Sequence, residues 1–124
     1  MPTSDFQFNY SDSPQDHLFV TVSGTWTMES AKECVDLIKK HSILHKRPKV
    51  LVNATQMSAP ESILSRYQTG EYIAKCWHSP MKVAFYVSLS NLNGLAMDTA
   101  INRGANVNAF PSKELALDWL FSKP

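Results

Sequence analysis

The sequence lacks the short motifs by which many enzyme families hold phosphates, metals or nucleophiles. Its four glycines are isolated from one another, so no glycine-rich loop is available to cradle a phosphate group. The chain contains neither a Gly-x-Ser-x-Gly nucleophile elbow nor a His-Glu-x-x-His zinc motif. We therefore expect no catalytic residues, no metal site and no cofactor, and we predict that the protein is not an enzyme.

Cysteine is also scarce. Cys34 and Cys76 are too few and too far apart for a disulfide framework or a Cys-x-x-Cys motif. Cys34 falls on the apolar side of a helical pattern, which predicts a buried core residue. Cys76 and His78 would point to different faces of a helix, but an enzyme that uses either of them remains a third functional hypothesis. The histidines show no metal-binding spacing, and we expect all of them at the surface: His17, His41, His45 and His78.

No stretch of the chain concentrates charge of one sign. The 12 lysines and arginines nearly balance the 11 aspartates and glutamates. The strongest basic cluster, at residues 45–49, lies where a helix should end, and cations are favoured there by the helix dipole. This pattern gives no support to nucleic-acid binding.

Long hydrophobic runs are absent as well. The longest, Val83–Val87, is far shorter than the roughly 20 residues that span a bilayer. Residues 1–5 lack the basic and then apolar pattern of a secretion signal. We expect no transmembrane segment and a cytoplasmic location.

The chain does contain enough apolar residues for one core, since 44% of its 124 residues are hydrophobic, and we predict a single domain over 1–124. The alternating segment Phe6–Tyr10 and the β-branched segment Leu18–Gly24 predict an antiparallel hairpin. Ser58, followed three residues later by Glu61, predicts a capping box at the start of a helix. The other expected elements are a helix from Thr27 or Glu29 to about His45, a strand at Val50–Val52, a helix after Ser58 that stops before Pro80, a strand at Met81–Val87, a helix at Asn93–Arg103, a strand at Val107–Phe110 and a terminal helix after Ser112.

This order of elements predicts the fold class. Strands that alternate with helices are joined by right-handed crossovers into a mainly parallel sheet. We expect an α/β domain with a mixed, mostly parallel five-stranded sheet, an N-terminal antiparallel hairpin and about four helices.

The same order resembles the STAS fold, in particular its SpoIIAA-like branch of small bacterial proteins. The resemblance spans nearly the whole chain and rests on Leu18–Gly24, Lys49–Asn53, Lys82–Phe85 and Val107–Leu120. The last of these is the most telling, because a strand ending in Phe, a capped turn and a helix ending in Ala-x-x-Trp-Leu are similar to the C-terminal signature of that branch. The resemblance implies a binding or regulatory module, and the fold hosts both protein docking and small-ligand binding.

Ser58 has two interpretations. In phosphorylatable members of the STAS family, an Asp-Ser-Ser or Asp-Ser-Thr run starts the helix after the third strand. Here the comparable stretch is Asn53–Ser58, where Ser58 is the residue that can match the modified serine and the preceding Asp is missing. Two roles of Ser58 therefore stay open: a phosphorylation site, as the resemblance implies, and the simpler role of a helix N-cap.

Three polar, nearly uncharged loops should meet at the C-terminal edge of the sheet, which is where ligands usually bind in open α/β folds. These are residues 23–27, 53–58 and 88–94. We predict that a protein partner docks on these loops, and Trp26 can serve as an anchor or as a cover for the sheet end. The predicted binding residues are Trp26, Asn53, Ser58, Ser90 and Asn91.

Two alternatives concern other partners. Aromatic and methionine side chains around the second and third predicted helices could line the site of a carrier or sensor of a small apolar or lipid-like ligand, although core packing explains the same pattern more simply. These residues are Met57, Tyr67, Tyr72, Trp77 and Met97. The edge strand Phe6–Tyr10 has few charges to discourage pairing, so a homodimer is a further expectation.

Overall fold

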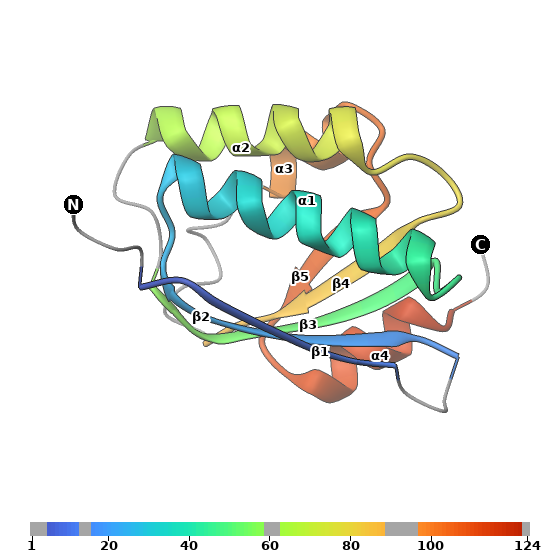
Figure 1. Cartoon of the computed structure of the whole chain (residues 1–124). Coiled ribbons are helices and arrows are strands. Elements are labelled where there is room, and N and C mark those ends of the chain that lie inside the picture. The colour runs from blue at the N-terminus through green and yellow to red at the C-terminus, as the bar shows by residue number, and fades with distance from the viewer. Residues whose placement is uncertain (1–4, 13–15, 59–62, 89–96, 123–124) are drawn as a thin grey trace.

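The sheet has its five strands in the order in which they occur along the chain, β1-β2-β3-β4-β5. A computed structural model describes residues 5–12, 16–58, 63–88 and 97–122 (Figure 1). The first two strands are antiparallel, and each later strand is parallel to the one before it. The strands are β1 (Gln7–Asp12), β2 (Leu18–Thr25), β3 (Lys49–Ser58), β4 (Lys82–Tyr86) and β5 (Val107–Phe110). The predicted fold class is confirmed.

The helices lie on both faces of this sheet (Figure 1). They are α1 (Met28–Leu44), α2 (Ile63–Cys76), α3 (Met97–Asn102) and α4 (Lys113–Leu120). Each parallel connection moves one strand further in the same direction, and right-handed crossovers therefore place α1, α2 and α3 on one face. The last helix, α4, follows the final strand and covers the opposite face.

The start of α1 is tied to the end of β2. Thr27 is the N-cap, and its side chain and that of Ser30 form a reciprocal capping box. The Ser30 hydroxyl also donates a hydrogen bond to the Thr25 carbonyl, at 2.8 Å. The helix therefore begins directly beside the carboxyl end of its preceding strand.

Each face of the sheet has its own core. On the α1 to α3 side, Val50 and Val52 of β3 join a large cluster that includes Ile38 and Trp77. The Trp77 indole N–H is satisfied inside this cluster, because it donates to the Val35 carbonyl at 3.1 Å. On the other side, the main contacts are those of Leu51 and Ala84 with Ala116 and Leu120 of α4. The centre of β3 is thus buried on both faces, which explains its fully apolar sequence.

The prediction of a loop at 53–58 was wrong, because β3 continues to Ser58. The register between β2 and β3 shifts after the pair Thr21–Asn53, and the next pair is Ser23–Gln56. The Asn53 side-chain oxygen accepts hydrogen bonds from the Thr55 N–H at 3.0 Å and from its hydroxyl at 2.6 Å. This local turn absorbs the extra residue as a bulge, so that the strand can resume its pairing with β2.

The predicted capping box at Ser58 stays a prediction. Ser58 is the last residue of β3 and pairs with Thr25, and the described part of α2 begins at Ile63. Its predicted partner Glu61 lies outside the described residues.

The prediction that all histidines lie at the surface was wrong for His17, which is 5% exposed and packs edge-on against Phe121. His41 and His45 are half-buried at the end of α1, and His78 is exposed. The predicted burial of Cys34 is confirmed, and burial together with the nearby Glu33 raises the pKa of its thiol.

Candidate functional site

Two of the predicted binding residues meet at the C-terminal edge of the sheet. The Trp26 N–H donates to the Ser58 carbonyl at 3.3 Å, just beyond the last pair of β2 and β3. The Trp26 ring is half-buried and packs against Phe6, with 6.4 Å between ring centroids. Trp26 therefore covers the end of the large core and still presents part of its surface to solvent beside the exposed Ser58.

Asp5, which precedes β1, is hydrogen-bonded to Thr25 at this edge. The Asp5 carboxylate accepts hydrogen bonds from the Thr25 N–H at 3.1 Å and from the Thr25 hydroxyl at 2.9 Å. These bonds lower the pKa of Asp5. Gly24 makes the close approach possible, because it adopts φ +121° and a Cβ there would lie 2.7 Å from the Asp5 carbonyl oxygen.

Of the other three predicted residues, the structure describes Asn53 alone. Asn53 lies within the sheet, between Thr21 of β2 and Tyr86 of β4, and its side chain is engaged in the bulge. Ser90 and Asn91 lie outside the described residues. The structure thus brings Trp26 and Ser58 together and separates Asn53 from them.

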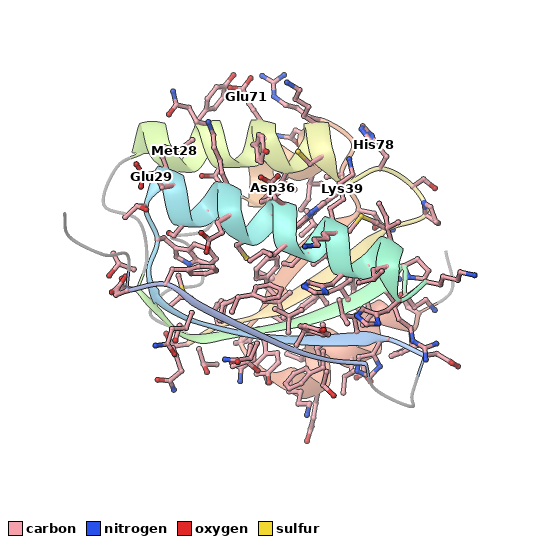
Figure 2. The ribbon with its side chains drawn as sticks, viewed as in Figure 1. Met28, Glu29, Asp36, Lys39, Glu71 and His78 are labelled. Carbon is pink, nitrogen blue, oxygen red and sulfur yellow. The ribbon has the colours of Figure 1, made fainter. Side chains whose placement is uncertain are left out.

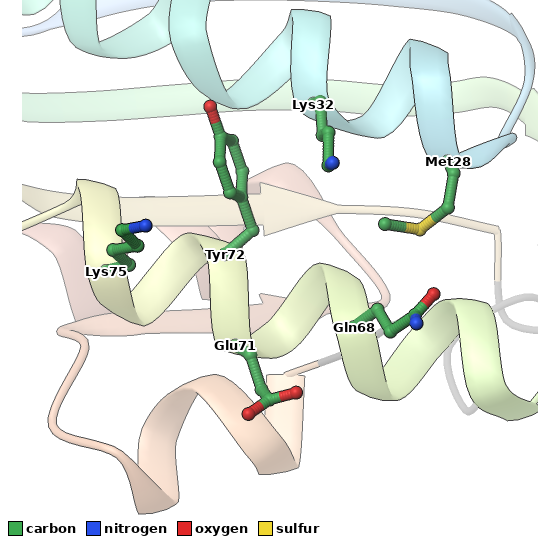
Figure 3. A pocket seen from close by; sticks show the side chains of 6 residues that line it. All are labelled: Met28, Lys32, Gln68, Glu71, Tyr72 and Lys75. Atoms are coloured by element: carbon green, nitrogen blue, oxygen red, sulfur yellow. The ribbon is translucent and has the colours of Figure 1, made fainter.

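A groove lies between α1 and α2 (Figure 3). It has a volume of about 430 Å³. Its lining residues are Met28 and Lys32 of α1 with Gln68, Glu71, Tyr72 and Lys75 of α2. Met28, which lines the groove at the start of α1, follows Trp26 by two residues, and we call the sheet edge and the groove together the edge–groove surface.

Tyr72 forms a fixed wall of the groove. Its hydroxyl donates to the Asp36 carboxylate at 2.6 Å, and this bond, together with contact to Cys76, raises the pKa of the phenol. The Lys32 ammonium lies over the Tyr72 ring, 5.6 Å from its centroid. These contacts hold the ring between the two helices.

The charges around the groove are unbalanced in favour of lysine. Glu71 forms an ion pair with Arg103 at 3.3 Å, and its side chain points away from α1 (Figure 3). Asp36 is engaged by Tyr72. Within residues 5–12, 16–58, 63–88 and 97–122, neither Lys32 nor Lys75 forms an ion pair with a carboxylate. The groove therefore offers two ammonium groups beside an aromatic ring and the Met28 thioether.

Sequence reasoning missed most of this groove. The sequence patterns did not single out Lys32, Gln68 or Lys75, and they pointed to Tyr72 only for an apolar ligand. The spacing of Met28 and Lys32 by four, and of Gln68 and Tyr72 by four, was the available signal, since residues at this spacing share a helix face. What the spacing cannot show is that the two faces adjoin.

The residues behind the carrier hypothesis are divided between core and surface. Met57 and Trp77 are each 3% exposed and belong to the large core. Tyr67 is exposed and its hydroxyl accepts from Arg103 at 2.7 Å, whereas Tyr72 lines the groove. The side chain of Met97 is outside the described set. Core packing accounts for the buried members of this set, Met57 and Trp77. The carrier hypothesis stays a prediction.

Of the residues considered for catalysis, Cys76 contacts Tyr72, but neither Cys76 nor His78 is among the residues that line the groove. Cys76 is half-buried at the end of α2, and His78 lies exposed beyond that end (Figure 2). In the part of the chain that the structure describes, no three His, Cys, Asp or Glu side chains are grouped so as to hold a metal ion. No described helix is both long enough and apolar enough to cross a bilayer.

Comparison with known proteins supports the fold. A solved structure of an uncharacterised protein of the DUF3478 family from Shewanella loihica PV-4, described as having a SpoIIAA-like fold, matches with a TM-score of 0.53. The match covers 97% of both chains at 17% sequence identity. No protein-family model and no curated protein matches the sequence. The comparison therefore extends to the fold and not to an activity.

Proposed function

We propose that this chain, which has a SpoIIAA-like fold, is a non-enzymatic binding module that docks a protein partner on its edge–groove surface. The observation that carries the proposal is the groove between α1 and α2, in which the hydroxyl of Tyr72 is bonded to Asp36 and its ring lies under the Lys32 ammonium. Aromatic side chains with adjacent polar groups are typical of protein-binding surfaces.

The groove suits a segment of a polypeptide chain. It offers an aromatic ring and a thioether for apolar side chains, the Gln68 amide for backbone groups, and the Lys32 and Lys75 ammonium groups for carboxylates. Both walls are helices, and Tyr72 is already hydrogen-bonded in place. Binding to such a preformed surface costs little side-chain ordering.

Site-specific crosslinking tests this function. A photo-crosslinking amino acid at Gln68, within the groove, is expected to give a discrete adduct with one protein in cells that produce the chain. The same amino acid at Asn106, an exposed position just before β5, is the matched control and should not give that adduct. The combined change Lys32→Glu and Lys75→Glu should reduce the Gln68 adduct about tenfold or more, because it reverses both charges of the groove.

The proposal fails if Gln68 and Asn106 give the same adducts, or if reversing both lysines leaves the Gln68 adduct unchanged. Circular dichroism of each variant checks that the fold is retained, since all four positions are solvent-accessible.

A further inference from the structure

The two edges of the sheet differ in how they are protected against pairing. At one edge β5 has only 4 residues, and Pro111 follows it directly. At the other edge β1 has 6 residues, and its sequence contains no lysine, arginine or proline. Its register with β2 is unbroken from Gln7 to Asp12. Short edge strands, prolines, lysines and bulges are the usual devices that prevent edge pairing, and β1 has none of them.

An apolar patch lies directly above the β1 edge. Tyr10 of β1 stacks on His41 of α1, with 4.0 Å between ring centroids, and remains 46% exposed. Leu44, one helical turn beyond His41, is 64% exposed, and Leu37, one turn before it, is half-buried. The patch therefore continues from the strand onto the flank of α1 that faces away from α2.

The same flank of α1 carries opposite charges in a self-complementary order. Glu33 and Lys40 are exposed, and each is one helical turn from Leu37, on opposite sides along the helix. Antiparallel pairing of two β1 strands about a two-fold axis also sets the two α1 helices antiparallel on one face of the joined sheet. When the two-fold axis passes beside Leu37, Glu33 of one helix lies opposite Lys40 of the other, so unlike charges meet.

We infer that a second copy of this chain binds the β1 edge, with the two β1 strands antiparallel in one continuous sheet. Backbone hydrogen bonds join the two edges, as in β-strand addition. Tyr10, Leu37 and Leu44 of both copies cover the join, and Glu33 of each copy faces Lys40 of the other.

This homodimer leaves the edge–groove surface open. Met28 and Lys32 line the groove on the flank of α1 that faces α2, whereas Glu33 and Leu37 lie on the other flank. The dimer would thus present two grooves, one in each copy. It goes beyond the proposed docking function, and neither depends on the other.

Sedimentation equilibrium of the full chain tests the inference at micromolar to millimolar concentrations. The wild-type protein should approach twice its 13.9 kDa mass as the concentration rises. Asn9 is exposed, and it alternates with Phe8 and Tyr10, so its side chain points to the face opposite α1. Asn9→Lys should weaken dimerisation at least about tenfold by placing like charges near each other across the join. Asn106→Lys, at the other edge of the sheet, should leave it unchanged.

A charge exchange on α1 provides an independent test that leaves the strand intact. Glu33→Lys and Lys40→Glu should each weaken the dimer several-fold, and the double variant should restore it, because only the double variant again opposes unlike charges. The inference is overturned if the wild type stays monomeric, if Asn9→Lys remains as dimeric as the wild type, or if the double variant fails to recover. If Asn9→Lys fails to fold, as judged by circular dichroism, the charge exchange decides.

Discussion

At the scale of single residues, Gly24 shows how a backbone position can depend on a distant contact. Its φ of +121° lies in a region that side chains disfavour, and a Cβ would meet the Asp5 carbonyl at 2.7 Å. Gly104 has a φ of +98°, but a Cβ at that residue would have nothing within 4 Å of it. A side chain at Gly24 would therefore meet both backbone strain and a steric clash, whereas a side chain at Gly104 would meet backbone strain alone.

We expect Gly24→Ala to destabilise the protein by about 2–3 kcal/mol, through strain and displacement of the Asp5 segment. Gly104→Ala, the matched control, should cost only the strain, about 1 kcal/mol. Urea denaturation of both variants measures the difference in the free energy of unfolding. Equal losses for the two variants would show that the contact between Gly24 and Asp5 is not important.

His41 is a second residue whose environment has a measurable consequence. Burial lowers the pKa of its imidazole below the ordinary value of 6.5, and the neighbouring His45 and Lys40 lower it further. From β1, the groups that pack on it are the uncharged rings of Phe8 and Tyr10. Its Nδ1 is buried with no hydrogen-bond partner among the described residues, so protonation would bury an unsatisfied donor.

The lowered pKa of His41 sets the sign of its effect on stability. The unfolded chain binds a proton at His41 more readily than the folded chain, so the folded state loses stability as the pH falls from about 7 through the lowered pKa. We expect His41→Gln to flatten the pH dependence of the free energy of unfolding in this window, whereas His78→Gln, at an exposed position, should leave it as it is. A His41→Gln protein with the wild-type pH dependence would contradict this assignment.

At the scale of elements, α1 and β2 form one unit through the capping box at Thr27 and Ser30. Thr27 supplies the oxygen that accepts from the Ser30 N–H at 3.0 Å, and Ser30 reaches back to the Thr27 N–H at 2.8 Å. The Ser30 hydroxyl then links this cap to the Thr25 carbonyl. The position of α1 over the sheet, and with it one wall of the groove, begins at this cap.

We expect Thr27→Ala to lower the free energy of unfolding by about 1 kcal/mol, because an orphan helix N–H loses its partner. Thr27→Asp should retain most of the stability, since aspartate also caps helices and its charge is favoured at a helix start. Thermal unfolding followed by circular dichroism compares the two. If Asp destabilises as much as Ala, the cap does not hold α1 in the way described.

At the scale of the whole molecule, the two flanks of α1 serve different surfaces. The flank toward α2 contributes Met28, Lys32 and Asp36 to the groove and its support. The opposite flank lies above the open edge of β1. A module that pairs through one flank and docks a partner on the other would bind two partner segments per dimer, which raises the apparent affinity for a bivalent partner.

Local patterns in the sequence suffice to predict the succession of strands and helices and the burial of their apolar faces. These features depend on local periodicity, as in the alternation of Phe6–Tyr10, or on a continuous apolar run, as in Val50–Val52. The burial of Cys34 could be predicted for the same reason, because its neighbours at helical spacing are apolar.

The end of β3 and the surfaces that adjoin are set by contacts between segments that are distant in sequence. Asn53–Ser58 has the composition of a loop, yet pairing with β2 carries it on as a strand, and that pairing joins residues far apart in sequence. Tyr72 and Asp36 are also 36 positions apart, so their hydrogen bond, and the groove beside it, exist only once α1 and α2 are packed side by side. Local patterns do not encode such contacts, because their free energy arises between elements and not within them.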